Sequence, residues 1–223
     1  MCRAHPAAGR GARPGVTRLV LASRNAHKVE EMARILADAG LAIEVLGIDA
    51  FEGVPEVAET GQTFADNALL KARAVCRATG EPAVADDSGL CVDELNGMPG
   101  ILSARWAGGH GDDTANMWLL LDQLTDTPDE RLAARFRCAV ALVLPDGRES
   151  VVEGEMIGAL VREPKGANGF GYDPIFVPDG VTRTSAELSA QEKDAISHRG
   201  NALRALVPVL REVLAPDGPA VPQ

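Results

Sequence analysis

The chain has few cysteines, few aromatic residues and no long apolar run. None of its apolar stretches approaches the roughly 18 residues of a membrane-spanning helix, so we expect no membrane partner. The four cysteines show no CxxC spacing, and three of them lie within apolar patterns. Such cysteines are typical of small core residues in a reducing compartment, which argues against a disulfide framework or a zinc site. We therefore expect a cytoplasmic protein.

Basic charge is also scarce. The sequence holds 22 Lys and Arg residues against 32 Asp and Glu residues, for a net charge of -10. Proteins that bind long nucleic acids do so through clustered Lys and Arg side chains, so no nucleic-acid partner is predicted. A small phosphorylated ligand remains compatible with this composition, because a few well-placed cations are enough to bind it.

The length of 223 residues, with 46% apolar residues, suits a single domain with an ordinary core. Residues 1–15 lack the continuous apolar run of a signal peptide, and we expect them to be a disordered leader. Residues 213–223 are rich in proline and are expected to form a flexible tail. No repeat or Pro/Gly linker divides residues 16–212, which we treat as one domain.

The order of apolar patterns predicts an α/β fold. Residues 17–22 and 41–46 read as short buried strands with a helix between them, and a further helix is expected over 63–80. Residues 135–144 alternate as a half-buried strand does, and the turn at 145–148 directs the chain into an antiparallel partner. We expect one mixed β-sheet, flanked by helices and extended into a second lobe.

A polar loop joins the first strand to the first helix. Free N–H groups and the positive end of the helix dipole face such a loop, and Lys28 adds a full charge, so the loop is a candidate anion site. It matches neither the Walker nor the dinucleotide fingerprint, and its Ser and Asn residues are also ordinary helix caps. The loop consists of Ser23, Arg24, Asn25, Ala26, His27 and Lys28.

Two adjacent carboxylates, Asp86 and Asp87, follow a short apolar run. The pattern predicts a strand that ends at these residues, a turn at Ser88-Gly89 and another strand over residues 90–95. Carboxylates at the carboxyl end of a strand favour a hard cation such as Mg²⁺ between them. An Asx-turn with a solvated second Asp explains the same residues, and this stretch alone leaves both interpretations open.

Three of the eight aromatic residues, Phe170, Tyr172 and Phe176, fall in a Gly- and Pro-rich loop over residues 163–180. Loops expose what they carry, so this loop is a candidate stacking surface for a flat ligand. Equally, Phe170 and Phe176 could fill the core beneath a structural loop.

Cationic side chains cluster before a final helix expected from Asn201. Lys193, His198 and Arg199 would suit a phosphate or a keto oxygen, although such a group is also common at a plain helix end. Lys71 lies off the apolar face of its helix, which by itself indicates an ordinary solvated lysine.

Together these segments resemble the inosine triphosphate pyrophosphatase family, whose members act on non-standard purine nucleoside triphosphates. The likeness runs from about Leu19 to Leu210, and the leader lies outside it. Ser23-Arg24 stands where many relatives have Thr-Gly, a change that removes no charge. The matching segments, in the family's order, are Ser23 to Lys28, Glu59-Thr60-Gly61-Gln62-Thr63-Phe64, Asn67-Ala68, Lys71-Ala72, Ala85 to Leu90, Pro99-Gly100-Ile101, Ser103-Ala104-Arg105, Gly169 to Pro174 and Ser197-His198-Arg199-Gly200.

The resemblance implies an elongated two-lobed α/β fold, usually a homodimer, with the nucleotide in the cleft between the lobes. By that likeness Ser23 to Lys28 would cradle the triphosphate with Lys71. Glu59 and Asp87 would hold Mg²⁺ with Asp86 beside them, and Asp87 would accept a proton. The remaining substrate contacts implied by the resemblance are Ser88, Phe170, Gly171, Tyr172, Asp173, Lys193, His198 and Arg199.

The implied reaction is hydrolysis of ITP, dITP or XTP to the nucleoside monophosphate and pyrophosphate. A keto oxygen at purine position 6 would be recognised by donors such as Arg199 or backbone amides. Two alternatives stay open from the sequence. One is a Maf-like pyrophosphatase that acts on other modified nucleotides, and the other is a nucleotide-binding module without catalysis.

Overall fold

The computed structural model describes residues 17–214. Over this range no helix is both long enough and apolar enough to span a lipid bilayer. The expected leader over residues 1–15 lies outside the described range. Of the expected tail over 213–223, Val213 and Leu214 belong to the last helix, and the rest lies outside the range.

Within the described range, six strands form one mixed sheet in the order β2-β1-β3-β4-β5-β6. The strands are β1 (Thr17–Leu21), β2 (Ile43–Gly47), β3 (Ala83–Val92), β4 (Ala133–Val143), β5 (Glu149–Leu160) and β6 (Phe176–Pro178). β1 pairs in parallel with β2 and β3, and every later pairing is antiparallel. The predicted α/β class with one mixed sheet is therefore confirmed.

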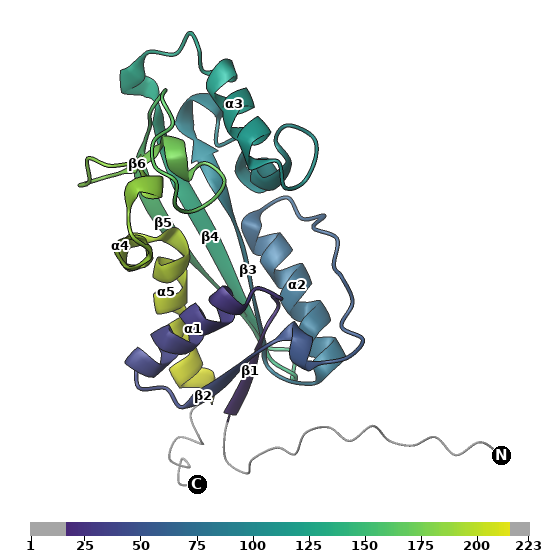
Figure 1. Ribbon diagram of the computed structural model, residues 1–223. Coiled ribbons are helices and arrows are strands. Elements are labelled where there is room, and N and C mark those ends of the chain that lie inside the picture. Colours follow the sequence, from purple (N-terminus) through teal and green to yellow (C-terminus); the bar gives the residue numbers. More distant parts are fainter. Residues whose placement is uncertain (1–16, 215–223) are drawn as a thin grey trace, which may run out of the picture.

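The helices lie against this sheet from both sides (Figure 1). They are α1 (Ala26–Asp38), α2 (Phe64–Thr79), α3 (Asp113–Gln123), α4 (Ala190–Ile196) and α5 (His198–Leu214). The long strands β3, β4 and β5 run the length of the molecule. One end carries β1, β2, α1 and α2, and the other carries α3 and β6, which gives the elongated outline in Figure 1.

Strand β3 is longer than the sequence pattern predicts. It continues without a break through Asp86, Asp87, Ser88 and Gly89, and Gly89 pairs with Arg137 of β4. The predicted turn at Ser88-Gly89 is therefore wrong, because β4 satisfies the backbone of the whole stretch. Gly89 instead allows the backbone at Gly100 to pack closely against β3, since a Cβ atom at position 89 would lie 2.4 Å from the Gly100 carbonyl oxygen.

Strand β4 was expected to be half-buried, but residues 138–143 are buried on both faces. Helix α2 covers one face of the sheet here and α5 covers the other. The strand is central, and small alanines on the α2 side alternate with larger residues on the α5 side. A central strand need not alternate in polarity, which explains why the pattern was misread.

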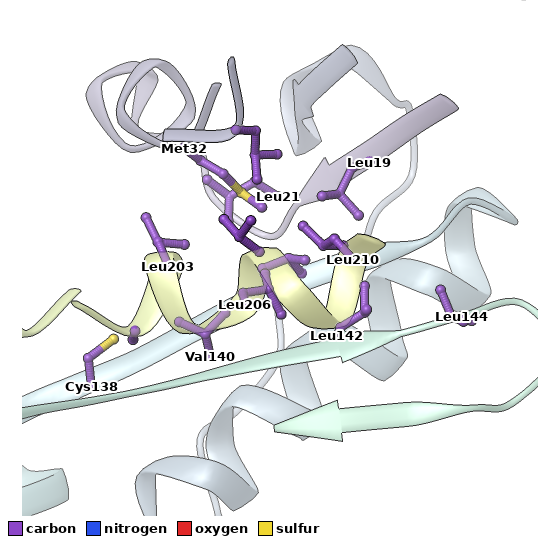
Figure 2. Close-up of a cluster of buried hydrophobic side chains, with 14 residues drawn as sticks. Leu19, Leu21, Met32, Cys138, Val140, Leu142, Leu144, Leu203, Leu206 and Leu210 are labelled. Atoms are coloured by element: carbon purple, nitrogen blue, oxygen red, sulfur yellow. The ribbon is translucent and has the colours of Figure 1, made fainter. Parts of the chain in front are cut away.

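One core cluster joins α1 and α5 to the sheet (Figure 2). Leu19 and Leu21 of β1 point into it, whereas Val20 belongs to the separate cluster beneath α2. A third cluster packs α3 and the loop before β6 against the far end of β3 and β4. Because successive residues of a strand face opposite sides, neighbouring residues of β1 and β3 reach different helices.

Local signals fix where the helices begin and end. Thr63 caps α2 in a capping box with Asp66, and Gly80 ends it in the left-handed conformation. Helix α5 begins at His198, three residues before the expected Asn201, and the Ser197 hydroxyl accepts the Gly200 N–H at 3.0 Å. This early start brings His198 and Arg199 into the first turn of α5.

Candidate active site

The site forms where β1 ends and β3 continues with β4 as its only neighbouring strand among the described residues. β1 pairs with β3 only up to Val84, and the Ala22 N–H then donates to the Val84 carbonyl at 2.8 Å. The polar loop leaves the sheet at this point and enters α1. Asn25 caps α1 by accepting the His27 N–H at 3.0 Å, so Lys28 lies in the first turn of the helix.

The two adjacent aspartates face opposite sides of the sheet. The Asp86 carboxylate contacts Lys28 of α1, whereas the Asp87 carboxylate contacts Asn67 and Lys71 of α2. This separation follows from the strand that replaces the expected turn, because alternate strand residues point to opposite faces. The site therefore consists of two charged groups divided by β3.

On the α2 face, one ammonium joins two carboxylates. Lys71 Nζ lies 2.7 Å from Glu59 Oε1 and 3.3 Å from Asp87 Oδ1. Burial lowers the pKa of Lys71, but the Asp87 and Glu59 charges raise it by more, so the pKa lies above its ordinary value. Lys71 is a mostly buried member of the site, so it is not the solvated lysine that its position suggested.

Asn67 completes this group, although the sequence analysis assigned it no role. Its side-chain amide donates to Asp87 Oδ2 at 3.0 Å and accepts the Gly61 N–H at 2.8 Å. The available signal was spacing, since Asn67 lies four residues before Lys71 and shares its face of α2. Burial raises the pKa of Asp87 above its usual value, and Lys71 and Asn67 oppose this effect without cancelling it.

The donor set limits how a metal could be held. Across residues 17–214, no group of three His, Cys, Asp or Glu side chains gathers around a common point. Glu59 and Asp87 supply two carboxylates that already share a cation, Lys71. Mg²⁺ is commonly bound by one or two carboxylates together with substrate phosphates and water, so this pair fits Mg²⁺ on those terms. Asp86 points to the other face of β3.

On the α1 and α5 face, Asp86 is enclosed by cations. Its side chain is 4% exposed, and its Oδ2 atom lies 2.7 Å from Lys28 Nζ and 3.5 Å from Arg199 Nε. Burial raises the pKa of Asp86, but Lys28 and Arg199 lower it more, and the pKa stands well below its usual range. Ser88, two residues along β3, faces the same side and is half-buried.

Arg199 is turned inward. The residue is 8% exposed, its Nη1 pairs with Glu31, and its Nη2 donates to the Lys28 carbonyl at 3.3 Å. Glu31 lies on α1 and was not among the residues expected at the site. The Arg199 side chain thus ties α5 to α1 and does not extend into solvent.

The aromatic loop divides between surface and core. Phe170 is 75% exposed, and Lys193 Nζ lies 5.1 Å from the centre of its ring. Lys193 also pairs with Asp173, whose carboxylate accepts the Phe170 N–H at 2.9 Å. The Gly171 N–H donates to Asp113 of α3 at 2.8 Å, a further contact that the sequence did not indicate.

The other two aromatic residues of the loop are buried. Phe176 packs against Phe136 with ring centres 4.8 Å apart, and the Tyr172 hydroxyl donates to the Ser103 carbonyl at 2.9 Å. Of the two interpretations of the loop, the core role holds for Phe176, and Phe170 alone has a free face. The expected stacking surface is therefore reduced to a single ring.

His198 is the first residue of α5, next to Arg199. Its ring stacks on Phe136 at 5.0 Å with an interplanar angle of 16°. Burial and then the charge of Lys193 lower the pKa of His198 to about 3, so the imidazole is neutral near pH 7. The rest of the polar loop is more open: His27 and Ala26 are exposed, and Arg24 pairs with Asp49 at 3.0 Å.

Residues 19–209 match the model of the Ham1 family. The chain belongs to the Ham1 family. It is similar to a dITP/XTP pyrophosphatase of Streptomyces coelicolor, with 64% identity over 199 residues, which are 89% of this chain and all of that protein. These matches confirm the family resemblance drawn from the sequence motifs, and they do not favour the Maf-like alternative.

Solved structures of Ham1 relatives share the fold. The crystal structure of a nucleoside-triphosphatase, also named dITP/XTP pyrophosphatase, from Mycobacterium abscessus is 56% identical with a TM-score of 0.73. The match covers 86% of this chain and all of that one. A HAM1 protein from Coxiella burnetii is 44% identical with a TM-score of 0.82, and the match covers 89% of this chain and all of that one.

Proposed function

We propose that this protein hydrolyses ITP, dITP and XTP to the nucleoside monophosphate and pyrophosphate, and that the reaction requires Mg²⁺. The observation that carries the proposal is the contact of the Lys71 ammonium with both the Glu59 and the Asp87 carboxylates, a group of charges suited to a metal-bound polyphosphate. The relatives named dITP/XTP pyrophosphatase, at up to 64% identity, give the substrate class.

The triphosphate would lie at the start of α1. The helix dipole favours an anion there, and Lys28 and Lys71 approach from the two faces of β3. Both ammonium groups now pair with carboxylates, so the phosphates would replace those partners. Lys28 and Lys71 would offset the charge that develops on the departing pyrophosphate.

Asp87 is the proposed proton acceptor. Glu59 and Asp87 would hold Mg²⁺, which neutralises phosphate charge and lowers the pKa of a bound water. The Asn67 amide fixes one oxygen of Asp87, and Lys71 contacts the other. Burial raises the pKa of Asp87, but Lys71 together with a bound cation would keep the carboxylate ionised, so that it could accept the proton of the attacking water.

The purine would stack on Phe170, the exposed ring of the aromatic loop. Lys193 Nζ lies over that ring and would donate a hydrogen bond to the keto oxygen of the purine. Its ion pair with Asp173 holds the lysine in place. An adenine amino group would leave this donor unpaired, which costs about 1–3 kcal/mol for each buried donor. The remaining donors would come from backbone amides of the loop and from neutral His198.

A substrate panel tests this proposal. Pyrophosphate release from ITP, dITP and XTP should far exceed release from ATP, CTP and dTTP, and EDTA should abolish it. Equal turnover across the panel, or turnover unaffected by EDTA, would overturn the assignment. We also propose a cytoplasmic homodimer by analogy with the family, and sedimentation velocity would test the dimer.

A further inference from the structure

One nitrogen of the Arg199 guanidinium lacks a hydrogen bond within residues 17–214. The Nη atoms bond to Glu31 and to the Lys28 carbonyl, but the Nε is buried and makes no hydrogen bond to any of the described residues. Leaving a buried charged donor unpaired is costly, and such groups are rare in folded proteins. Asp86 Oδ2 lies 3.5 Å from this nitrogen, close enough for an ion pair but too far for a good hydrogen bond.

The same oxygen already bonds to another cation. Lys28 Nζ lies 2.7 Å from Asp86 Oδ2. The Lys28 side chain is 35% exposed, whereas the Asp86 side chain is almost completely buried on a strand that is hydrogen-bonded to β4. Lys28 can therefore turn toward a ligand at the start of α1, and Asp86 cannot follow it.

A phosphate that takes Lys28 would leave Asp86 as a buried anion without a hydrogen bond. Arg199 Nε needs to approach by only about half an ångström to reach the usual N–H···O distance of about 2.9–3.0 Å. That small shift would give the unpaired donor and the abandoned acceptor a partner in one step. Glu31 and the Lys28 carbonyl keep the guanidinium in line with Asp86.

We propose that Asp86 is a positioning residue that exchanges Lys28 for Arg199 when a triphosphate binds. The inference rests on the proposed function, because it requires a phosphate to draw Lys28 away. Arg199 lies in the first turn of α5 next to His198, so the exchange links occupancy of the phosphate loop to the part of the site that faces the purine. Arg199 then acts on the phosphate side even for a ligand that has no base.

Inorganic tripolyphosphate is the probe that separates this role from a contact with the base. We would titrate it into protein carrying ¹⁵N-labelled arginine, in EDTA so that no turnover occurs. The Arg199 Nε–H resonance, assigned by its loss in Arg199→Lys, should move downfield as it gains a carboxylate acceptor. An Nε–H resonance that does not move at saturating tripolyphosphate would overturn the exchange.

Calorimetry of the same ligand gives an independent measure. Arg199→Lys should weaken tripolyphosphate binding about tenfold, because one ammonium cannot hold Glu31, the Lys28 carbonyl and Asp86 together. In an Asp86→Asn background the same change should have little further effect, since no charge is then left to be satisfied. Unaltered affinity in Arg199→Lys, or effects that simply add, would argue against the proposal.

Arg34→Lys is the matched control. Arg34 lies on α1, as Glu31 does, and pairs with Asp194 of α4 at 2.7 Å, but this pair is largely exposed. The control should bind tripolyphosphate as the wild type does. Because the resonance is measured on wild-type protein, a folding defect in a variant, detected by circular dichroism, does not remove the test.

Failure of the exchange is distinguishable from failure of the proposed function. A wild type that hydrolyses ITP and binds tripolyphosphate, but shows no response at Arg199, would overturn the exchange alone. A wild type that neither binds tripolyphosphate nor hydrolyses ITP would overturn both.

Discussion

The Asn67 side-chain amide donates a 3.0 Å hydrogen bond to the Asp87 carboxylate, from one turn before Lys71 on α2. Because Asn67 also accepts the Gly61 N–H, its orientation is fixed from both ends. It therefore fixes the orientation of the carboxylate of Asp87, the proposed base. Such a residue should influence turnover more than substrate binding.

We predict that Asn67→Ala lowers kcat for ITP by about 10- to 100-fold, with a smaller change in KM. Stability should also fall, by about 1 kcal/mol, because the half-buried Gly61 N–H loses its acceptor. Asn116→Ala is the matched control, since Asn116 is equally buried and accepts the Ala107 N–H at 2.7 Å. Full kcat in Asn67→Ala, or an equal loss of kcat in the control, would contradict this role.

Replacing the proposed base itself should be more severe. Asp87→Asn keeps the shape of the side chain but removes its proton acceptor, and general-base catalysis contributes about 10²–10⁴-fold. Turnover of ITP in excess Mg²⁺ should fall by that factor. Asp93→Asn serves as a control, because Asp93 follows β3 and forms an exposed pair with Arg135. Near-normal turnover by Asp87→Asn would show that another group takes the proton.

The sequence predicted the arrangement of elements better than the course of β3. Apolar patterns and caps located the helices and the antiparallel hairpin, because these signals are local. Asp-Asp-Ser-Gly looks locally like a turn, yet these residues pair with β4, some 50 residues further along the chain. Only that long-range pairing makes the stretch a strand, and no local pattern encodes it.

The error in β3 carries over to the site. Side by side in a turn, Asp86 and Asp87 would form one acidic pair, but in a strand they serve opposite faces. The burial of Lys71 was missed for the same reason. The side of α2 that carries Lys71 is polar, and it is covered only when Glu59 and β3 pack against it. The family motifs supplied the identities of these residues, and the geometry of their partners came from the fold.

The exposed ring of Phe170 permits a test of purine stacking that does not disturb the core. We predict that Phe170→Ala raises KM for ITP about tenfold, because stacking of a base on an aromatic side chain is worth about 1–3 kcal/mol. Stability should be unchanged, since the ring is largely solvated. Ile157→Ala removes another exposed apolar side chain, on β5, and should leave KM unaltered. An unchanged KM in Phe170→Ala would remove the stacking role.

His198 gives a prediction about stability and pH. Burial and Lys193 lower its pKa from 6.5 to about 3 in the folded protein, and Arg199 and Lys28 act in the same direction against Asp86. Between these two pH values the unfolded chain binds a proton that the folded protein does not. The free energy of unfolding must therefore fall as the pH falls below about 6.5, by up to about 1.4 kcal/mol per pH unit from this residue.

His198→Phe keeps a ring against Phe136 but cannot take up a proton. Between pH 7 and pH 5 the variant should lose up to about 2 kcal/mol less stability than the wild type, as measured by urea unfolding at both pH values. His110→Phe, at an exposed position, should follow the wild type. The same loss in the wild type and in His198→Phe would mean that His198 becomes charged inside the folded protein, and its proposed place as a neutral ring beside the purine would fail.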